Sequence, residues 1–360
     1  MSDVLVFVGS TADAGEGGGI YSYRLNANTG ALEQVAVFSD ITYPSFQTLS
    51  PDGGSIYSVC RLDVADEEPN GGVAAFSIDP SSGSLTVLNS VSSRGAGAVH
   101  VSADGTGHCL AVANYSGGNL AIVPIDSRGA LSEASDFVQF AGSSIDPDRQ
   151  QGSFAHSVII SDDSRHLFVQ DLGTDKIMQF HLDPAHGKIK PTDPPFVATE
   201  LGAGPRHLKI HKNHKWAYVI NELDNTLVLY DYDQGKGTLA QRQVISTLPE
   251  DFEGTSYCAD IHIHPSGRLL YGSNRGHDSI VVFDINEADG TLSLAQLQAC
   301  GGDHPRNFAL TPDASLLLCA NMNSDNIVAY RIDPETGQVT PTGRETAAPR
   351  PVCVTCLVVG

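Results

Sequence analysis

Two rows of polar side chains recur along this chain, and their types could support acid–base chemistry on an anionic molecule. His156, Arg206 and Arg306 each stand just before an apolar run, and Glu222 and Arg275 each follow one. An imidazole or a carboxylate can act as a general base near neutral pH. Guanidinium groups bind carboxylate or phosphate and stabilise a developing oxyanion. Such chemistry requires a fold that brings these distant residues together.

A repeated phrase predicts that fold. Each copy has a strand-like run, often an Asp, a few polar residues, a Gly and a second strand-like run, as in Phe76-Ser-Ile-Asp-Pro-Ser-Ser-Gly83-Ser-Leu. The Gly supplies the positive φ of a hairpin turn. The copies recur at Gly30, Gly83, Gly129, Gly187, Gly237, Gly290 and Gly337. A period of roughly 50 residues made of strands indicates propeller blades of four strands each.

A second phrase, an aliphatic run, a turn and another apolar run, occurs in six complete copies between the hairpins. The seventh copy is split between the chain ends. Residues 352–359 are predicted to form its first strand, and residues 4–8, 20–25 and 32–38 the other three. Closing the last blade with both termini removes open sheet edges. We therefore expect residues 1–360 to form one all-β domain, a seven-bladed β-propeller of four-stranded antiparallel blades.

The repeat also predicts which side chains surround the central channel. The first two strands of a blade are antiparallel, so the start of one and the end of the other lie on the same face. Alignment of the copies places a cluster of charged side chains there: His156, Arg206, His207, Glu222, Arg275, Arg306, Arg350 and, adjoining them, Arg61. A further row of Asn and Asp, including Asp171, is expected mainly to hold turns.

Several arginines at equivalent positions of an acidic protein favour a site for an anionic ligand. The alternative is that they pair with Asp171, Asp260 or Glu222 and only hold loops in place. Of the residues in a catalytic site, His156 or Glu222 could be the base, and Arg206 or Arg275 could stabilise an oxyanion. Arg306 and Arg350 could hold a phosphate or carboxylate.

Composition limits the partners. The chain has 42 acidic and 21 basic side chains and a net charge of −21, so nucleic acids and anionic membranes would be repelled. No stretch approaches the roughly 20 apolar residues of a membrane span, and the run at residues 4–8 is too short for the core of a signal peptide. Seven cysteines are an odd number without a regular framework. We expect a cytoplasmic, reduced protein.

Neither a metal nor a cofactor is expected. His262 and His264 point to the same face of a strand, but His264 aligns with turn positions of the other repeats. Cys353 and Cys356 are three apart on a predicted strand and point to opposite faces, which disfavours chelation. The glycine-rich segments lack the strand–helix context of a phosphate-binding loop.

The chain resembles, over nearly its whole length, the seven-bladed lactonase family, which contains bacterial propeller-type 6-phosphogluconolactonases and fungal 3-carboxy-cis,cis-muconate lactonizing enzymes. The phrases that carry the resemblance are Gly204-Pro-Arg-His207, Asn221-Glu-Leu223, Ser246-Thr-Leu-Pro249 with Phe252, Ser273-Asn-Arg-Gly-His-Asp-Ser279 and His304-Pro-Arg306. The resemblance implies catalytic roles for His156, Arg206, Glu222 and Arg275. We expect the substrate to contact His207, Arg306, Arg350, His277 and Asp171.

One departure bears on activity. The family usually has Pro-His-x-His where this chain has Ser153-Phe-Ala-His156, so Phe154 replaces the first His. The resemblance favours hydrolysis of a small anionic lactone, with 6-phosphogluconolactone as the first choice. The alternatives are a muconate-type lactonizing cycloisomerase, which the same residues would suit, and a propeller that binds a ligand without turnover. Fold-level similarity alone does not separate them.

Overall fold

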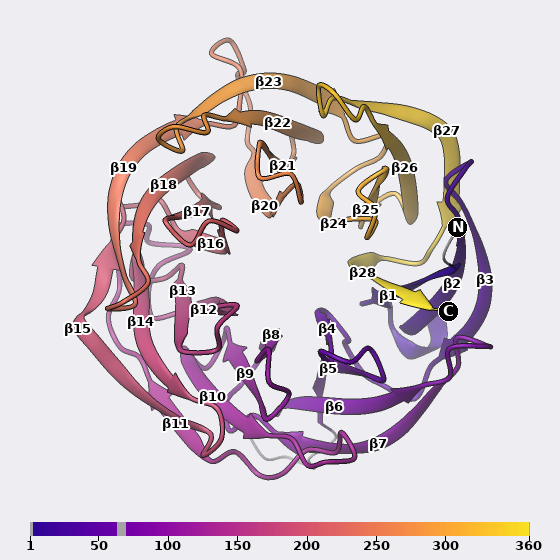
Figure 1. The fold of residues 1–360 in the computed structure, drawn as a ribbon, viewed down its shortest axis with the longest axis horizontal. Helices are drawn as coiled ribbons and strands as arrows, with labels where there is room; N and C mark the ends of the chain where they lie inside the picture. Colours follow the sequence, from indigo (N-terminus) through magenta and orange to yellow (C-terminus); the bar gives the residue numbers. More distant parts are fainter. Residues whose placement is uncertain (1–2, 63–69, 360) are drawn as a thin grey trace.

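The structure is a computed structural model that describes residues 3–62 and 70–359. Within those residues the chain forms seven four-stranded antiparallel sheets arranged in a ring, with the innermost strands around the centre (Figure 1). The one helical element in these ranges is a short 3-10 turn, η1 (Ala14–Glu16). The predicted fold class, a seven-bladed all-β propeller, is confirmed.

The blades follow one another around the ring in chain order, and within each of the first six blades the strands run in sequence from the innermost outward. The first three are β4 (Gln47–Leu49), β5 (Ser55–Arg61), β6 (Gly71–Ile78) and β7 (Leu85–Ser92); β8 (Ala98–Ala103), β9 (Cys109–Asn114), β10 (Asn119–Pro124) and β11 (Asp136–Gln139); and β12 (Ala155–Ile160), β13 (His166–Asp171), β14 (Lys176–Asp183) and β15 (Lys188–Ala198). The next three are β16 (Pro205–Ile210), β17 (Trp216–Asn221), β18 (Thr226–Asp233) and β19 (Thr238–Ser246); β20 (Tyr257–Ile263), β21 (Leu269–Arg275), β22 (Ser279–Ile285) and β23 (Leu292–Ala299); and β24 (Pro305–Leu310), β25 (Leu316–Asn321), β26 (Asn326–Ile332) and β27 (Val339–Ala347).

The seventh blade joins the two ends of the chain, as predicted. Its order is β28 (Pro351–Val359), β1 (Asp3–Ser10), β2 (Gly19–Asn26) and β3 (Ala31–Phe38). The C-terminal strand β28 pairs along the whole of β1, with Val6 opposite Cys356. The ring is thus closed by backbone hydrogen bonds between strands from opposite ends of the sequence.

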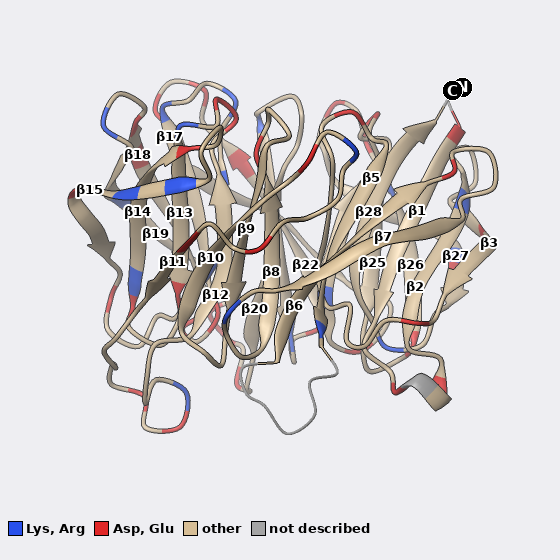
Figure 2. Cartoon of the chain, turned by 90° about the horizontal axis from the view of Figure 1, so that it is seen from below, with Lys and Arg blue, Asp and Glu red and all other residues tan. Residues whose placement is uncertain are grey.

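The hydrophobic core lies between neighbouring blades. One apolar cluster contains Leu227 and Leu229 of β18 together with Val281 and Phe283 of β22 in the next blade. The hairpin glycines that revealed the repeat all have positive φ, between 58° and 83°. The side view shows many of the charged residues in the loops at the two faces of the ring (Figure 2). In the described part of the chain, no helix is long and apolar enough to cross a membrane.

Candidate active site

β-Bulges at the starts of innermost strands decide which side chains enter the channel. In β12, Ala155 pairs with Asp171 and Ser157 with Gln170, so His156 between them has no partner across the strand. Arg206 in β16 and Arg306 in β24 likewise have no partner on the neighbouring strand. A bulge re-aims the extra residue. His156, Arg206 and Arg306 accordingly all line a narrow cavity in the middle of the ring.

The bulge in the last blade changes the expected place of Arg350. Gly9 pairs with Cys353 and Ser10 with Pro351, so Val352 is the residue passed over. Val352 lines the narrow cavity with His156, Arg206 and Arg306. Arg350 lies two residues earlier, is exposed, and its backbone N–H donates to Asp325 at 2.7 Å. The structure therefore does not bring Arg350 to the predicted site.

A pocket of about 370 Å³ opens above this narrow cavity. Its charged and imidazole lining comes from five blades and one loop. The lining includes Arg61, Arg149, His156, Glu222, Arg275 and Arg306, with Tyr43, Ser45, Asn70, Tyr115 and Ser116. Arg206 does not line this pocket and lies beneath it, in the narrow cavity.

Glu222 is the centre of the pocket's charge network. Its Oε2 atom lies 2.9 Å from Nε of Arg206 and 2.8 Å from Nη2 of Arg275, and its Oε1 atom 2.5 Å from Nη2 of Arg149. Glu222 is only 4% exposed. Burial alone would raise the pKa of Glu222, but Arg275, Arg206 and the other cations around it hold that pKa well below its ordinary value. Glu222 is therefore a firmly ionised counter-ion and a weak base.

His156 is the group best placed to accept a proton. Its Nε2 atom lies 3.7 Å from Oε2 of Glu222, and its Nδ1 atom is buried with no hydrogen-bond partner among the described residues. Burial and the nearby charge of Arg206 hold the pKa of His156 well below the ordinary value. The imidazole is thus neutral at neutral pH, and Nε2 is the nitrogen that faces Glu222.

Arg149 was not predicted from the sequence. It lies in the loop between β11 and β12, where its backbone N–H donates to Asp146 at 2.9 Å. Its guanidinium lies 5.3 Å from the ring centre of Tyr257, in addition to its ion pair with Glu222. A signal was present, because the interval from Gly129 to Gly187 is the longest between hairpin glycines and contains this loop.

Two further arginines line the pocket wall. Arg306 forms no hydrogen bond or ion pair with any described residue, and burial lowers its pKa. Arg61 is exposed and lies 5.3 Å from the ring centre of Tyr43. Neither guanidinium has an ion-pair partner among residues 3–62 and 70–359, so both are available to an anion in the pocket.

Other predicted residues lie outside the pocket. Asp171 is buried and binds Ser153 Oγ at 2.7 Å and the backbone N–H of Phe154 at 2.8 Å, so it holds the segment before β12. His277 packs edge-on against Phe252. His207 is buried beneath the pocket, between Asp260 and Arg206.

Phe154, which stands where the family usually has a His, also lies outside the pocket lining. Its ring stacks on Tyr115, with ring centres 4.9 Å apart. Tyr115 in turn meets the edge of His156, at 5.5 Å between ring centres. The substitution therefore keeps an aromatic contact behind the candidate base.

The chemistry of the donor set favours anions over cations. Among the described residues, no group of three or more His, Cys, Asp or Glu side chains is placed to hold a metal ion. His262 uses Nε2 to bind Asp260 at 3.1 Å, and His264 binds Ser266 in its turn, as expected from the repeat alignment.

The fold and the site together define a seven-bladed β-propeller with a pocket lined by Arg, His and Glu at one mouth of its channel. The model of the family "Lactonase, 7-bladed beta-propeller" matches residues 5–356, and the chain belongs to this family. It is 36% identical to the 6-phosphogluconolactonase of Formosa agariphila, over 93% of this chain and 94% of the relative, and 32% identical to that of Bacillus subtilis, over 98% of each. The solved structure of the periplasmic gluconolactonase of Pseudomonas aeruginosa superimposes with a TM-score of 0.91 at 29% identity, covering 100% of both chains.

Proposed function

We propose that this protein is a lactonase that hydrolyses a sugar lactone carrying an anionic group, with 6-phosphogluconolactone as the preferred substrate. The observation that carries the proposal is the contact of one buried carboxylate, Glu222, with three guanidinium groups beside the neutral imidazole of His156. Membership of the lactonase family and the names of its relatives support the reaction class.

In the proposed first step, Nε2 of His156 takes a proton from a water molecule as the water oxygen attacks the lactone carbonyl carbon. The carbonyl π electrons move to oxygen and form a tetrahedral oxyanion. Glu222, 3.7 Å from the same Nε2 atom, stabilises the imidazolium that results. Arg275 and Arg149 line the pocket beside Glu222, and in this mechanism their positive charge stabilises the developing oxyanion.

In the second step the intermediate collapses. The carbonyl re-forms, the bond between the carbonyl carbon and the ring oxygen breaks, and the imidazolium of His156 returns its proton to the leaving oxygen. The product is the open-chain hydroxy acid, and His156 is neutral again. Arg206 lies below the pocket and holds Glu222 through its Nε atom instead of touching the substrate.

The anionic group of the substrate is assigned to Arg306 and Arg61. Both line the pocket, and Arg306 has no protein partner among the described residues. A phosphate can accept two parallel hydrogen bonds from a guanidinium group. This local basic cluster would hold a small anion although the chain has a net charge of −21. We propose the cytoplasm as the compartment of the protein, where its seven free cysteines would stay reduced.

The test is a comparison of rates above spontaneous hydrolysis for 6-phosphogluconolactone and gluconolactone, together with lactonization of carboxymuconate. We expect the highest kcat/KM with the phosphorylated lactone. A higher kcat/KM with carboxymuconate would replace the proposal by the cycloisomerase alternative. Saturable binding of one of the two lactones without any turnover would replace the proposal by that of a propeller that binds a ligand without catalysis.

A further inference from the structure

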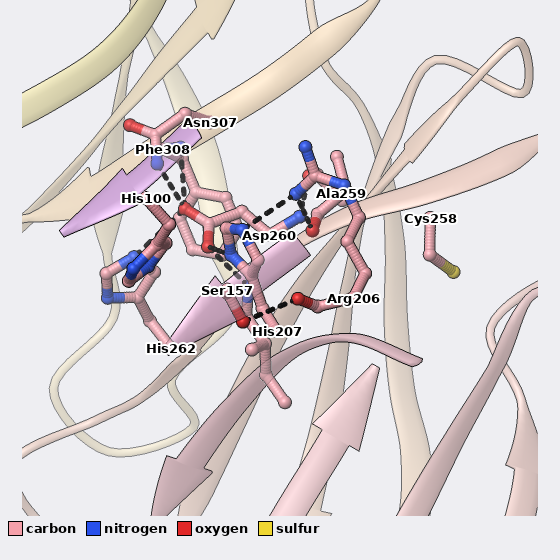
Figure 3. Close-up of polar contacts among 12 residues, drawn as sticks. His100, Ser157, Arg206, His207, Cys258, Ala259, Asp260, His262, Asn307 and Phe308 are labelled. Atoms are coloured by element: carbon pink, nitrogen blue, oxygen red, sulfur yellow. Dashed lines mark hydrogen bonds and ion pairs between the residues drawn. The ribbon is translucent and has the colours of Figure 1, made fainter. Parts of the chain in front are cut away.

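Beneath the active-site pocket lies a second buried carboxylate, Asp260, which is 2% exposed (Figure 3). Unlike Glu222, it forms no ion pair with an Arg or Lys among the described residues. Five hydrogen-bond donors surround it instead. They are the side chains of His207 at 2.8 Å, His262 at 3.1 Å and Asn307 at 2.5 Å, and the backbone N–H groups of Ile261 at 2.9 Å and Phe308 at 3.3 Å.

This shell keeps Asp260 ionised. Burial opposes ionisation, but His262 and His207, together with the other donors, hold the pKa of Asp260 well below its usual range. An ionised carboxylate accepts hydrogen bonds and donates none. The contact from Asp260 to Nδ1 of His207 therefore requires the hydrogen to be on Nδ1.

The other ring nitrogen of His207 meets a group that can only donate. Nε2 of His207 lies 3.1 Å from Nη1 of Arg206, and a guanidinium group has no hydrogen-bond acceptor. Nε2 must therefore carry a lone pair. Burial and the charge of Arg206 lower the pKa of His207 to about 4, so the ring is neutral at neutral pH. Asp260 and Arg206 together select one tautomer of one imidazole.

The lone pair on His207 helps to fix the direction of Arg206. The Nη1 atom of Arg206 also donates to the carbonyl of Ala259, and its Nε atom donates to Oε2 of Glu222 at 2.9 Å. Three contacts thus orient one guanidinium that does not line the substrate pocket. Loss of the acceptor at Nε2 of His207 would change the orientation of Arg206 and, through it, the position of the Glu222 carboxylate in the pocket.

We propose that Asp260 is a positioning residue of the active site, which locks His207 in its Nδ1–H tautomer and thereby orients Arg206 and the Glu222 carboxylate next to His156. The inference rests on the proposed lactonase function for its kinetic consequences, but the tautomer itself is independent of any substrate. The carboxylate acts on the reaction through two intervening side chains.

His262 provides a matched control. It binds the same carboxylate on the side away from Arg206, and with Asp260 it lines a separate pocket formed by later residues of the innermost strands, toward the other face of the ring. Replacing His262 by Gln offers Asp260 an amide donor in place of the imidazole and leaves the other four donors, and the contact between His207 and Arg206, as they are.

The first measurement is the tautomer of His207, from proton–nitrogen correlation spectra of protein labelled with 15N in histidine. The signals of His207 are those absent from the His207→Asn variant. We expect the neutral Nδ1–H form in the wild type. A neutral Nε2–H form, or a charged ring at neutral pH, would overturn the inference even if the protein hydrolysed no lactone.

The second measurement is the kinetics of Asp260→Asn and His262→Gln. For Asp260→Asn we expect kcat to fall about 10-fold or more, because a misplacement of about 1 Å in an active site can cost about 100-fold in rate, while KM changes little. The midpoint pH of the acid limb of kcat/KM should also shift, because the charges of Arg206 and Glu222 influence the pKa of His156. Partial unfolding would lower the rate without moving that pH. His262→Gln should stay close to the wild type.

His207→Asn covers the case in which Asp260→Asn does not fold. An Asn amide can still donate to Asp260 from near the position of Nδ1, but it offers Arg206 no acceptor at the position of Nε2. The same loss of kcat is expected. Unchanged kcat and an unmoved acid limb in a folded His207→Asn variant would refute the positioning role, whereas a wild type that hydrolyses no lactone would refute only the proposed function.

Discussion

The Nε atom of Arg206 lies 2.9 Å from Oε2 of Glu222 because the bulge at the start of β16 turns Arg206 toward the end of β17. Glu222 directly follows the last residue of β17, so two neighbouring strands of one blade supply both partners. Arg275 from the next blade and Arg149 from a loop complete the cluster. The contact shows how an irregular strand start supplies a functional side chain while the rest of the sheet stays regular.

Replacing Glu222 by Gln should abolish most of the activity. Three guanidinium groups lose their shared counter-ion and the imidazolium of His156 loses its stabilising charge, so we expect kcat/KM to fall about 100-fold or more. Steady-state rates on 6-phosphogluconolactone, with circular dichroism to verify folding, provide the measurement. Glu335→Gln, on an exposed outer hairpin, is the control and should match the wild type. A folded Glu222→Gln variant with near-normal kcat/KM would exclude the proposed role.

The pH dependence of kcat/KM should reveal His156. Burial and Arg206 hold the pKa of His156 well below 6.5, and the base must be unprotonated to act. We therefore expect no loss of kcat/KM as the pH falls from 8 to 6.5, with the acid limb at lower pH. His156→Gln should lose about 100-fold in rate and the acid limb with it. An acid limb centred above 6.5 would contradict this assignment.

Arg306→Gln should discriminate between substrates. If Arg306 holds the phosphate, losing a charged hydrogen-bond partner worth about 1.5–3 kcal/mol raises KM for 6-phosphogluconolactone about 10- to 100-fold. Gluconolactone, which lacks the phosphate, should be hydrolysed as before. Equal effects on both substrates would argue against a phosphate contact.

Arg350→Gln tests the register of the last blade. Alignment of the repeats placed Arg350 beside Arg306, whereas the bulge puts Val352 there and leaves Arg350 exposed. We expect unchanged KM and kcat with both lactones. An increase in KM specific for the phosphorylated lactone would instead support the simple alignment.

Stability should decrease on mild acidification. Burial, with neighbouring positive charge, lowers the pKa values of His100, His156 and His207 in the folded state. Below an unfolded-state pKa of about 6.5, the unfolded chain therefore binds protons that the folded chain does not, and each His can lower the free energy of unfolding by up to about 1.4 kcal/mol per pH unit.

Urea unfolding at pH 7 and pH 5.5 measures this effect. The free energy of unfolding should be lower at pH 5.5, and the difference should shrink in His100→Gln. His186 is exposed at an outer hairpin, so His186→Gln should leave the difference as it is. Equal free energies of unfolding at the two pH values would show that the buried histidines do not make stability depend on pH.

The fold and half of the site could be predicted from the sequence because the spacing of the repeat indicates four-stranded blades, and such blades arrange in a ring. Seven hairpin glycines and a repeated strand–turn–strand phrase indicated the blades, and the split copy indicated the closure of β28 on β1. Equivalent positions in a ring must converge on its axis. The repeat alone therefore predicts that His156, Glu222 and Arg275 lie at one mouth of the channel.

The remaining features depend on tertiary structure. A β-bulge adds one residue to a strand and leaves no mark in a motif alignment, so Val352 took the place predicted for Arg350. Arg149 belongs to a loop outside the repeat, and only folding shows that it reaches Glu222. The pairing of Asp260 with His207, instead of with an arginine, likewise follows from which donors lie within hydrogen-bond distance in three dimensions. The repeat in the sequence determines which positions face the axis, but the strand irregularities and the loops decide which charges meet there.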